Sequence, residues 1–430
     1  MEETTQILLI QAHSRTRSNL FNTFVYTSFY PSITLEQLIS ITPKSYQVDY
    51  VDERYQSIDL NWKGSLVGIS TLTPNALHAY SIADEFRKKG ITVVLGGYHP
   101  SAVPEEALQH ADAVVIGEAE ISWPQLLRDF ENRELKPFYR APLVDPTMIP
   151  SPRRPSGNFP YIGVVQASRG CPNQCRFCAI NNVEGSRFRA RPIEQVIDEI
   201  KSLETERFMF ADSSMTIDTH FTKQLFQEMI GLNKKFSCYG NINILQSDDE
   251  LLSLAKKAGC ETWLIGFESI NQESLHHIGK STNKVQDYSS GIKKINEYEM
   301  RIIGLFIFGF DADTPDIFET TLKAIYEWEL DRAAFAILTP FPGTELFHEL
   351  EKEGRILTKD WEKYNLREVV FQPKNLSVDQ LFRGRNTIVK QYYSFSNCLR
   401  RSIQDEHLDF NRFIRRTAGD FFLNRYFKYI

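Results

Sequence analysis

The chain has 430 residues, of which 42% are hydrophobic and 24% charged, and these values are ordinary for a globular protein with two domains. Its formal net charge is −6, so no overall positive field attracts a phosphate backbone, and nucleic acid is not expected as a partner. No apolar run has the length of a signal-peptide core or a membrane span, which predicts a cytoplasmic protein and leaves peripheral membrane contact open.

The first 135 residues alternate short apolar runs with helical patterns. This alternation predicts an α/β fold, with a Rossmann-like, doubly wound parallel sheet over residues 1–135. Strands are expected at 6–12, 46–52, 66–70, 92–97 and 113–118, with helices near 34–41, 75–89, 104–110 and 122–131. Ligands of such sheets bind outside the carboxyl ends of the strands. The residues expected there are Ser70, Thr71, Leu72, Thr73, Gly96, Gly97, Tyr98, His99, Gly117 and Glu118.

A proline-rich connector over residues 136–160 separates this domain from a second alternating series, because proline lacks an amide donor and discourages regular structure. Strands of the second series are expected at 161–168, 207–213, 236–242, 262–269, 301–310 and 333–340. Six strand–helix units are fewer than the eight of a closed barrel. We therefore expect a partial, open (β/α)6 barrel of the TIM type over residues 161–345, followed by a mainly helical C-terminal region over 346–430.

The last part of the chain, residues 377–430, is basic and aromatic. It has ten Lys and Arg against five Asp and Glu, which gives +5 in a protein that is acidic overall. Two interpretations are open. The segment is either a helical cap that closes the open barrel or a segment that lies at a membrane interface.

Three cysteines follow the first predicted strand of the second series with the spacing C-x3-C-x2-C, at Cys171, Cys175 and Cys178. Thiolates are the ligands of iron–sulfur clusters, and three of them on a four-iron cluster leave one iron open. Zinc would need a fourth ligand nearby, and the next histidine, His220, is too far along the chain for local pairing. The remaining cysteines are scattered, which favours core positions and a single cluster.

This motif resembles the signature of the radical S-adenosylmethionine (AdoMet) superfamily, C-x3-C-x-aromatic-C, with Phe177 at the aromatic position. The resemblance implies that AdoMet chelates the open iron of a 4Fe-4S cluster and is cleaved to a 5′-deoxyadenosyl radical. Later segments resemble the AdoMet-contacting strands of that superfamily. By this resemblance the AdoMet contacts are expected at Phe177, Asp212, Ser213, Glu268, Phe308 and Pro340.

Residues 95–127, LGGYHPSAVPEEALQHADAVVIGEAEISWPQLL, resemble the cobalamin-binding half of B12-dependent radical AdoMet enzymes. The D-x-H-x-x-G motif of other B12 proteins is missing, and the nearest segment is QAHSRTRSN, so base-off cobalamin without a histidine from that motif is implied. His99 is expected to line the pocket only. The alternative is a Rossmann-like domain that shapes the active site without a corrin.

The resemblance implies methylation of an unactivated carbon by way of the deoxyadenosyl radical and methylcobalamin. A second reading, similar to the bacteriochlorophyll cyclase, is ring formation or oxidation with the same cofactors. A third is a regulator that binds cobalamin or AdoMet without turnover, which the intact cysteine trio argues against. The expected partners are a small-molecule, lipid or tetrapyrrole-like substrate, or a peptide, and an electron donor such as flavodoxin or ferredoxin.

Overall fold

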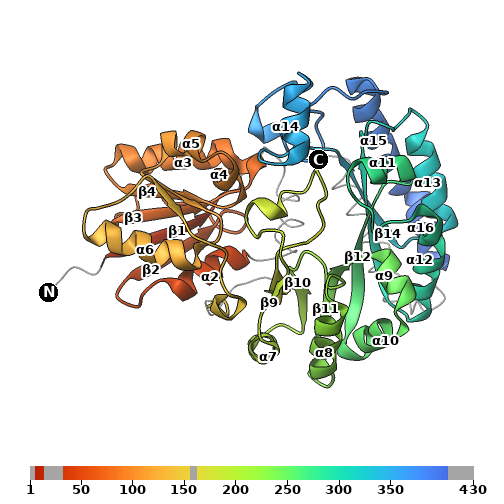
Figure 1. Ribbon diagram of the computed structural model, residues 1–430, viewed down its shortest axis with the longest axis horizontal. Helices are drawn as coiled ribbons and strands as arrows, with labels where there is room; N and C mark the ends of the chain where they lie inside the picture. The colour runs from red at the N-terminus through yellow and green to blue at the C-terminus, as the bar shows by residue number, and fades with distance from the viewer. Residues whose placement is uncertain (1–4, 14–31, 155–161, 405–430) are drawn as a thin grey trace.

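The computed structural model describes residues 5–13, 32–154 and 162–404, which form two six-stranded sheets (Figure 1). In the first sheet every adjacent pair is parallel, in the order β2-β1-β3-β4-β5-β6. Its strands are β1 (Gln6–Gln11), β2 (Gln47–Asp52), β3 (Leu66–Ser70), β4 (Thr92–Gly96), β5 (Ala113–Ile116) and β6 (Phe138–Arg140). The predicted Rossmann-like parallel sheet is confirmed.

Strands β3 and β5 are buried along their whole length, because helices cover both faces of this sheet. The covering helices are α2 (Ile33–Ile41), α3 (Ala76–Lys88), α4 (Tyr98–Ala102), α5 (Pro104–Ala107) and α6 (Ala119–Glu131). Figure 1 shows α2 and α6 on one face and α3 to α5 on the other. Trp123 and Leu126 of α6 belong to one core cluster, and Phe86 of α3 belongs to the other.

The proline-rich connector is more structured than its composition predicts. Its residues 138–140 form β6, which pairs with β5, and Pro146–Met148 form a short 3-10 helix. Pro137 stands just before β6, and its carbonyl accepts a hydrogen bond from the Val114 amide at 2.9 Å. Because β6 is an edge strand, a proline at its start removes no ladder bond that the sheet needs.

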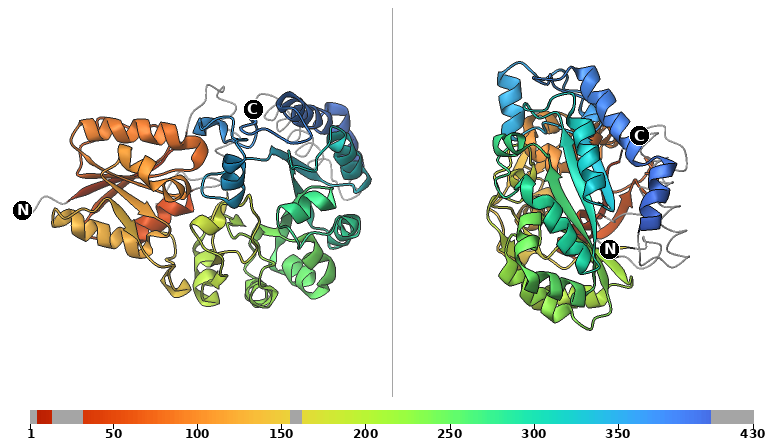
Figure 2. Two further views of the ribbon diagram at one scale, coloured as in Figure 1. Left: turned by 45° about the horizontal axis from the view of Figure 1, so that its top comes forward. Right: turned by 90° about the vertical axis from the view of Figure 1, so that its right-hand side faces the viewer.

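The second sheet is also parallel throughout, in the order β14-β13-β12-β11-β10-β7. Its strands are β7 (Gly163–Val165), β10 (Arg207–Phe210), β11 (Lys235–Gly240), β12 (Cys260–Glu268), β13 (Arg301–Phe308) and β14 (Arg332–Ile337). The helices between them are α7 (Ile193–Ser202), α8 (Thr219–Met229), α9 (Ile242–Ser247), α10 (Asp249–Ala258), α11 (Gln272–His277), α12 (Tyr288–Glu297) and α13 (Ile317–Glu327). Figure 2 shows helices along the outside of this curved sheet. The predicted open barrel of six strands is confirmed.

Local sequence signals explain where these elements begin and end. Helix α10 begins after Asp248, whose carboxylate accepts the Leu251 amide at 3.0 Å, and it ends at Gly259. Gly259 has φ +101°, and a Cβ at this position would lie 2.1 Å from the Lys234 carbonyl oxygen. Only glycine fits this turn, which starts β12 in register with β11.

Two additions frame the mouth of the barrel. A short antiparallel ladder, β8 (Ser168–Arg169) with β9 (Arg189–Ala190), closes the base of the cysteine loop. Beyond the barrel lie α14 (Glu345–Lys352), α15 (Val378–Tyr392) and α16 (Phe395–Gln404). Between them, the Trp361 indole donates to Glu106 of the first domain at 2.8 Å, so this region packs on both halves of the molecule.

Helix α15 covers the edge strand β14. Arg385 donates to the Phe335 carbonyl at 3.0 Å and the Tyr393 hydroxyl to the Ala333 carbonyl at 2.8 Å, so side chains occupy carbonyls that have no neighbouring strand. The aromatic run that ends the chain lies outside the described residues. Within the described ranges, no helix combines the length and apolar character needed to cross a membrane.

Candidate active site

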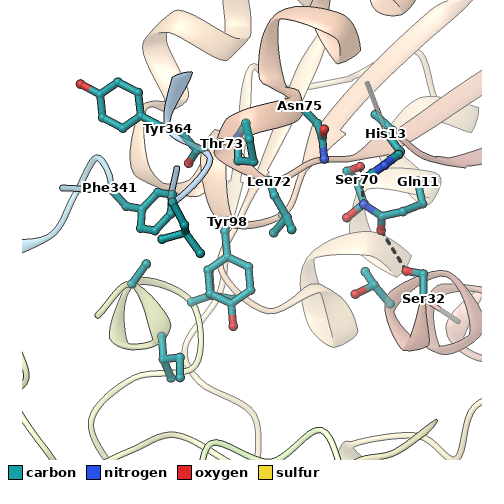
Figure 3. Close-up of a pocket in the computed structure, with 18 of the residues that line it drawn as sticks. Gln11, His13, Ser32, Ser70, Leu72, Thr73, Asn75, Tyr98, Phe341 and Tyr364 are labelled. Carbon is teal, nitrogen blue, oxygen red and sulfur yellow. Dashed lines mark hydrogen bonds between the residues drawn. The ribbon is translucent and has the colours of Figure 1, made fainter. Parts of the chain in front are cut away.

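A cavity of about 2020 Å³ lies between the two sheets, at the carboxyl ends of both. Such a volume is about twice the upper end of the usual range for small-molecule pockets. Figure 3 shows Leu72, Thr73 and Tyr98 of the first domain near Phe341, which follows the last barrel strand. The cavity can therefore hold more than one ligand at once.

Most residues expected at the carboxyl ends of the first sheet reach this cavity. Those that line it are Ser70, Leu72, Thr73, Gly96, Gly97, Tyr98, Gly117 and Glu118. Thr71 and His99 are fully buried beside the cavity instead of lining it. The His99 ring lies 3.3 Å from the Thr73 hydroxyl and 3.4 Å from the Glu106 carboxylate, so its ring nitrogens have partners inside the protein.

Two glycines with positive φ shape the side of the cavity that the first domain lines. Gly97 has φ +99°, and a Cβ there would lie 2.7 Å from the Thr71 carbonyl oxygen. Gly117 has φ +81°, and a Cβ there would meet nothing within 4 Å. At Gly97 a side chain would collide with the Thr71 backbone, whereas at Gly117 the missing side chain leaves bare backbone that a ligand can approach closely. This cradle fits a large ligand such as a corrin.

The three predicted cluster cysteines lie in one loop between β8 and β9, and all three are free and half-buried. Neighbouring backbone fixes the loop. The Cys171 amide donates to the Gly185 carbonyl at 3.2 Å, and the Arg176 amide donates to the Ile278 carbonyl at 3.0 Å. Phe177 and Cys178 line the cavity, so the loop opens on the space that the first domain also lines.

Burial controls the electrostatics of these thiols. It raises the pKa of Cys175 to about 11 and also raises the pKa of Cys178, while the Lys280 ammonium opposes both shifts. Among the described residues no three His, Cys, Asp or Glu side chains group as ligands of one metal ion, whereas an iron–sulfur cluster takes its thiolates on separate irons. Three half-buried thiols in one loop, of which Cys178 lines the cavity, are a donor set that fits such a cluster.

The residues expected to contact AdoMet divide into two groups. Phe177 and Glu268 line the cavity, whereas Asp212, Ser213, Phe308 and Pro340 do not. The Phe308 ring packs at 4.8 Å from the Phe318 ring on the helix side of the sheet, and its neighbour Ile307 faces the cavity.

Asp212 is buried below the cysteine loop. Its carboxylate accepts the Ala167 amide at 3.0 Å and the Ser168 hydroxyl at 2.5 Å, just before the loop begins. Burial raises the pKa of Asp212 to about 6 despite these hydrogen bonds. In this structure Asp212 positions the strand that leads into the loop.

The sequence analysis missed a buried charge network that joins the two halves. Arg169 and Arg189, on the β8–β9 ladder, both bind the Glu118 carboxylate, at 3.1 and 2.7 Å. Arg169 also binds Glu120 at 2.8 Å. The available signal was an arginine two residues before Cys171, in a chain segment with no nearby acidic residue to pair with it.

A second link runs through Glu184, which follows the cysteines. Its carboxylate accepts the Gly170 amide at 3.1 Å, so it ties together the two ends of the loop. The Tyr98 hydroxyl of the first domain donates to the same carboxylate at 3.3 Å. The cysteine loop is therefore bonded directly to the domain that lines the opposite side of the cavity.

Comparisons with known proteins match the division of the chain into a first parallel-sheet domain and a barrel domain. The model of the Radical SAM superfamily matches residues 165–325, and the model of the B12 binding domain matches residues 49–127. The chain is 31% identical to bacteriochlorophyllide d C-12(1)-methyltransferase of Chlorobaculum tepidum, over 91% of this chain and 90% of that protein. The chain belongs to the B12-binding radical AdoMet enzymes.

Two further relatives share less of their sequence with this chain. The anaerobic magnesium-protoporphyrin IX monomethyl ester cyclase of Cereibacter sphaeroides is 27% identical over 76% of this chain and 60% of that protein. The structure of the radical AdoMet methyltransferase TsrM from Kitasatospora setae, with cobalamin and a 4Fe-4S cluster bound, superposes with a TM-score of 0.68 at 17% identity. That match covers 81% of this chain and 78% of TsrM, and it shows the shared fold.

Proposed function

We propose that this B12-binding radical AdoMet enzyme methylates an unactivated carbon of a tetrapyrrole substrate. The observation that carries the proposal is the single cavity lined both by the carboxyl ends of the first sheet and by Cys178 of the cluster loop. When bound, the cluster and AdoMet supply a 5′-deoxyadenosyl radical and cobalamin supplies the methyl group. The substrate carbon must meet both, so both cofactor sites have to open on one space.

Different residues that line the cavity, or lie beside it, are assigned here to each of the three cofactors. We place the corrin against Gly97, Gly117 and Tyr98, where bare backbone and one aromatic ring face the cavity. Cys171, Cys175 and Cys178 would hold the cluster. Phe177 and Glu268 would contact AdoMet, since both line the cavity beside the loop.

The residues that line the barrel wall favour a flat, apolar substrate. Leu305 and Ile307 of β13 and Ala334 and Ala336 of β14 line the cavity, and the two alanines leave room beside the aliphatic side chains. A broad apolar wall with few polar groups suits a planar macrocycle, because it excludes water and sets orientation without specific hydrogen bonds. The Chlorobaculum tepidum relative, by its name, acts on bacteriochlorophyllide d, which supports the same substrate class.

We further propose that cobalamin binds base-off, without a histidine from a D-x-H-x-x-G motif on cobalt. His13, at the end of β1, is a histidine that lines the cavity. Burial lowers the pKa of His13, so it is the residue whose coordination to cobalt the test has to exclude. The test is the EPR spectrum of bound cob(II)alamin, which would show no nitrogen splitting in the native protein or in His13→Ala. Nitrogen splitting that His13→Ala abolishes would refute base-off binding without a histidine.

The experiment that tests the proposed function begins with anaerobic reconstitution with iron, sulfide and hydroxocobalamin, followed by metal analysis. One four-iron cluster and one cobalt per chain are expected. Turnover then uses methyl-deuterated AdoMet, reduced flavodoxin or ferredoxin as electron donor, and bacteriochlorophyllides as substrates. A product heavier by a deuterated methyl group supports methyl transfer. An unlabelled, oxidised or cyclised product supports the cyclase reading instead, and a cluster without cobalt contradicts both.

A further inference from the structure

An ion pair lies directly beside the cysteine loop on the barrel side. The Lys280 ammonium is 3.0 Å from the Glu268 carboxylate, and the two side chains are 19% and 10% exposed. Glu268 ends β12 with φ +62°, at an irregularity in its register with β13. Because the strand geometry fixes Glu268, it also fixes the ammonium that pairs with it.

The backbone that leads to Lys280 is packed on the cysteine loop. The Ile278 carbonyl accepts the Arg176 amide at 3.0 Å. Gly279 has φ +74°, and a Cβ there would lie 2.8 Å from the Gln174 carbonyl oxygen and 3.9 Å from the Cys175 Cα. The close approach requires glycine, and it places the next residue, Lys280, against the loop.

Lys280 is the cation that acts on the thiols. Its charge opposes the rise of the pKa of both Cys175 and Cys178, and those two sulfurs in turn help to raise its own pKa. Arg176 is nearer in sequence, but its guanidinium turns away to Glu345, at 2.9 Å, and to Glu349. A buried charge in this position is weakly screened by solvent.

We propose that Lys280 is a positioning residue that sets the reduction potential of the cluster, making it easier to reduce, and that Glu268 limits this effect. On reduction the cluster accepts one electron from the external donor and gains one unit of negative charge. A fixed positive charge nearby stabilises the reduced form more than the oxidised form, and a fixed negative charge does the opposite. This inference rests on the cluster of the proposed function and is independent of the methyl-transfer step.

Removing the charge of Lys280 or of Glu268 is therefore expected to shift the midpoint potential of the cluster in opposite directions. Lys280→Met removes the cation and leaves Glu268 unopposed, so the midpoint potential of the cluster becomes more negative. Glu268→Gln keeps a hydrogen-bonding partner for the ammonium and removes the anion, so the midpoint potential becomes more positive. Lys280→Arg keeps the charge and stays near the native value.

The test is an EPR-monitored redox titration of the reconstituted full-length protein without AdoMet. Iron and sulfide analysis precedes it, so that loss of the cluster from the native chain, which would refute the proposed function, is recognised separately. Lys284→Met is the matched control, because Lys284 is exposed and lies four residues further along the chain. Its midpoint potential is expected to equal that of the native protein.

An unchanged midpoint in Lys280→Met with a full complement of iron would overturn the inference. If Lys280→Met fails to assemble the cluster, Glu268→Gln decides alone. A positive shift supports the electrostatic role, whereas a negative shift or none refutes it.

Discussion

The guanidinium of Arg169 lies 3.1 Å from the carboxylate of Glu118, and both side chains are almost fully buried, at 8% and 3% exposure. Arg169 ends the short strand β8 before the cysteine loop, and Glu118 stands at the start of α6 in the first domain. This pair joins the loop that would hold the cluster to the domain that would hold cobalamin. The distance between the two cofactors would thus depend on a buried charge pair.

We predict that Arg169→Met destabilises the protein strongly. It would leave Glu118 with the Arg189 guanidinium and the Val144 amide and would remove the ion-pair partner of Glu120, and breaking one side of a buried ion pair costs about 3–5 kcal/mol. The matched control is Arg207→Met, whose pair with Glu261 is 48% and 43% exposed and is expected to contribute about 0–1 kcal/mol. Thermal unfolding measures both, and equal melting temperatures for the two variants would contradict the prediction.

We predict a pH-dependent destabilisation from Asp212. Its pKa is 3.8 in the unfolded chain and about 6 in the folded protein, because burial penalises the carboxylate. The folded state therefore binds more protons between these values, and this group's contribution to stability falls as pH rises from about 4 to about 6. A difference of about two pKa units corresponds to about 3 kcal/mol, which is fully lost above pH 6.

Asp212→Asn tests this prediction, because the amide oxygen can still accept the Ala167 amide proton and no charge develops. Melting temperatures of the native protein and the variant, measured from pH 4.5 to 7.5, should diverge in favour of the variant as pH rises. The exposed Asp145→Asn serves as the control and should show no such trend, since the native carboxyl of Asp145 has a lowered pKa. Parallel curves for Asp212→Asn and the native protein would refute the assignment.

The fold could be predicted because most of the strands have a distinct local sequence pattern. Buried parallel strands such as LVGIS at 66–70 are continuous apolar runs between turns, and the predicted and observed bounds there coincide. The connector was the exception, because β6 is three residues long and depends on pairing with β5 rather than on its own sequence. Pairing with a distant strand leaves no local pattern to detect.

Which side chains of a strand face the cavity was harder to predict than the position of the strand itself. Strand β13 reads RIIGLFIF, which is apolar at both alternate positions, so its sequence does not reveal which set faces the cavity. In the structure Leu305 and Ile307 face it, and Phe308 packs on the outer helices. Phe308, which was expected to contact AdoMet, therefore does not line the cavity, whereas its neighbour Ile307 does.

The charge network could not be predicted for a different reason. Arg169 and Glu118 are 51 positions apart, and Lys280 and Glu268 meet only because a loop folds back on the cysteine segment. The sequence shows each charge but not its partner. Glycine carries better information, since positive φ or close approach restricts the position to that residue.

Our last prediction uses this property to test where cobalamin binds. Gly117→Ala places a methyl group in the cavity, since nothing lies within 4 Å of its Cβ position, and φ +81° adds backbone strain of about 1–2 kcal/mol. Gly90→Ala is a matched control, because Gly90 has φ +77° and equally open surroundings but does not line the cavity. The two variants should therefore lose similar stability for the same backbone reason.

Only Gly117→Ala should lose cobalamin, because its methyl group stands where the corrin would approach bare backbone. The measurement is cobalt retained per chain after reconstitution and desalting, compared with the melting temperature of each variant. A large fall in cobalt for Gly117→Ala, with native content in Gly90→Ala, separates obstruction of the ligand from backbone strain. Native cobalt content in both variants would place the corrin elsewhere in the cavity. An equal loss of cobalt in both variants would trace the effect to lost stability.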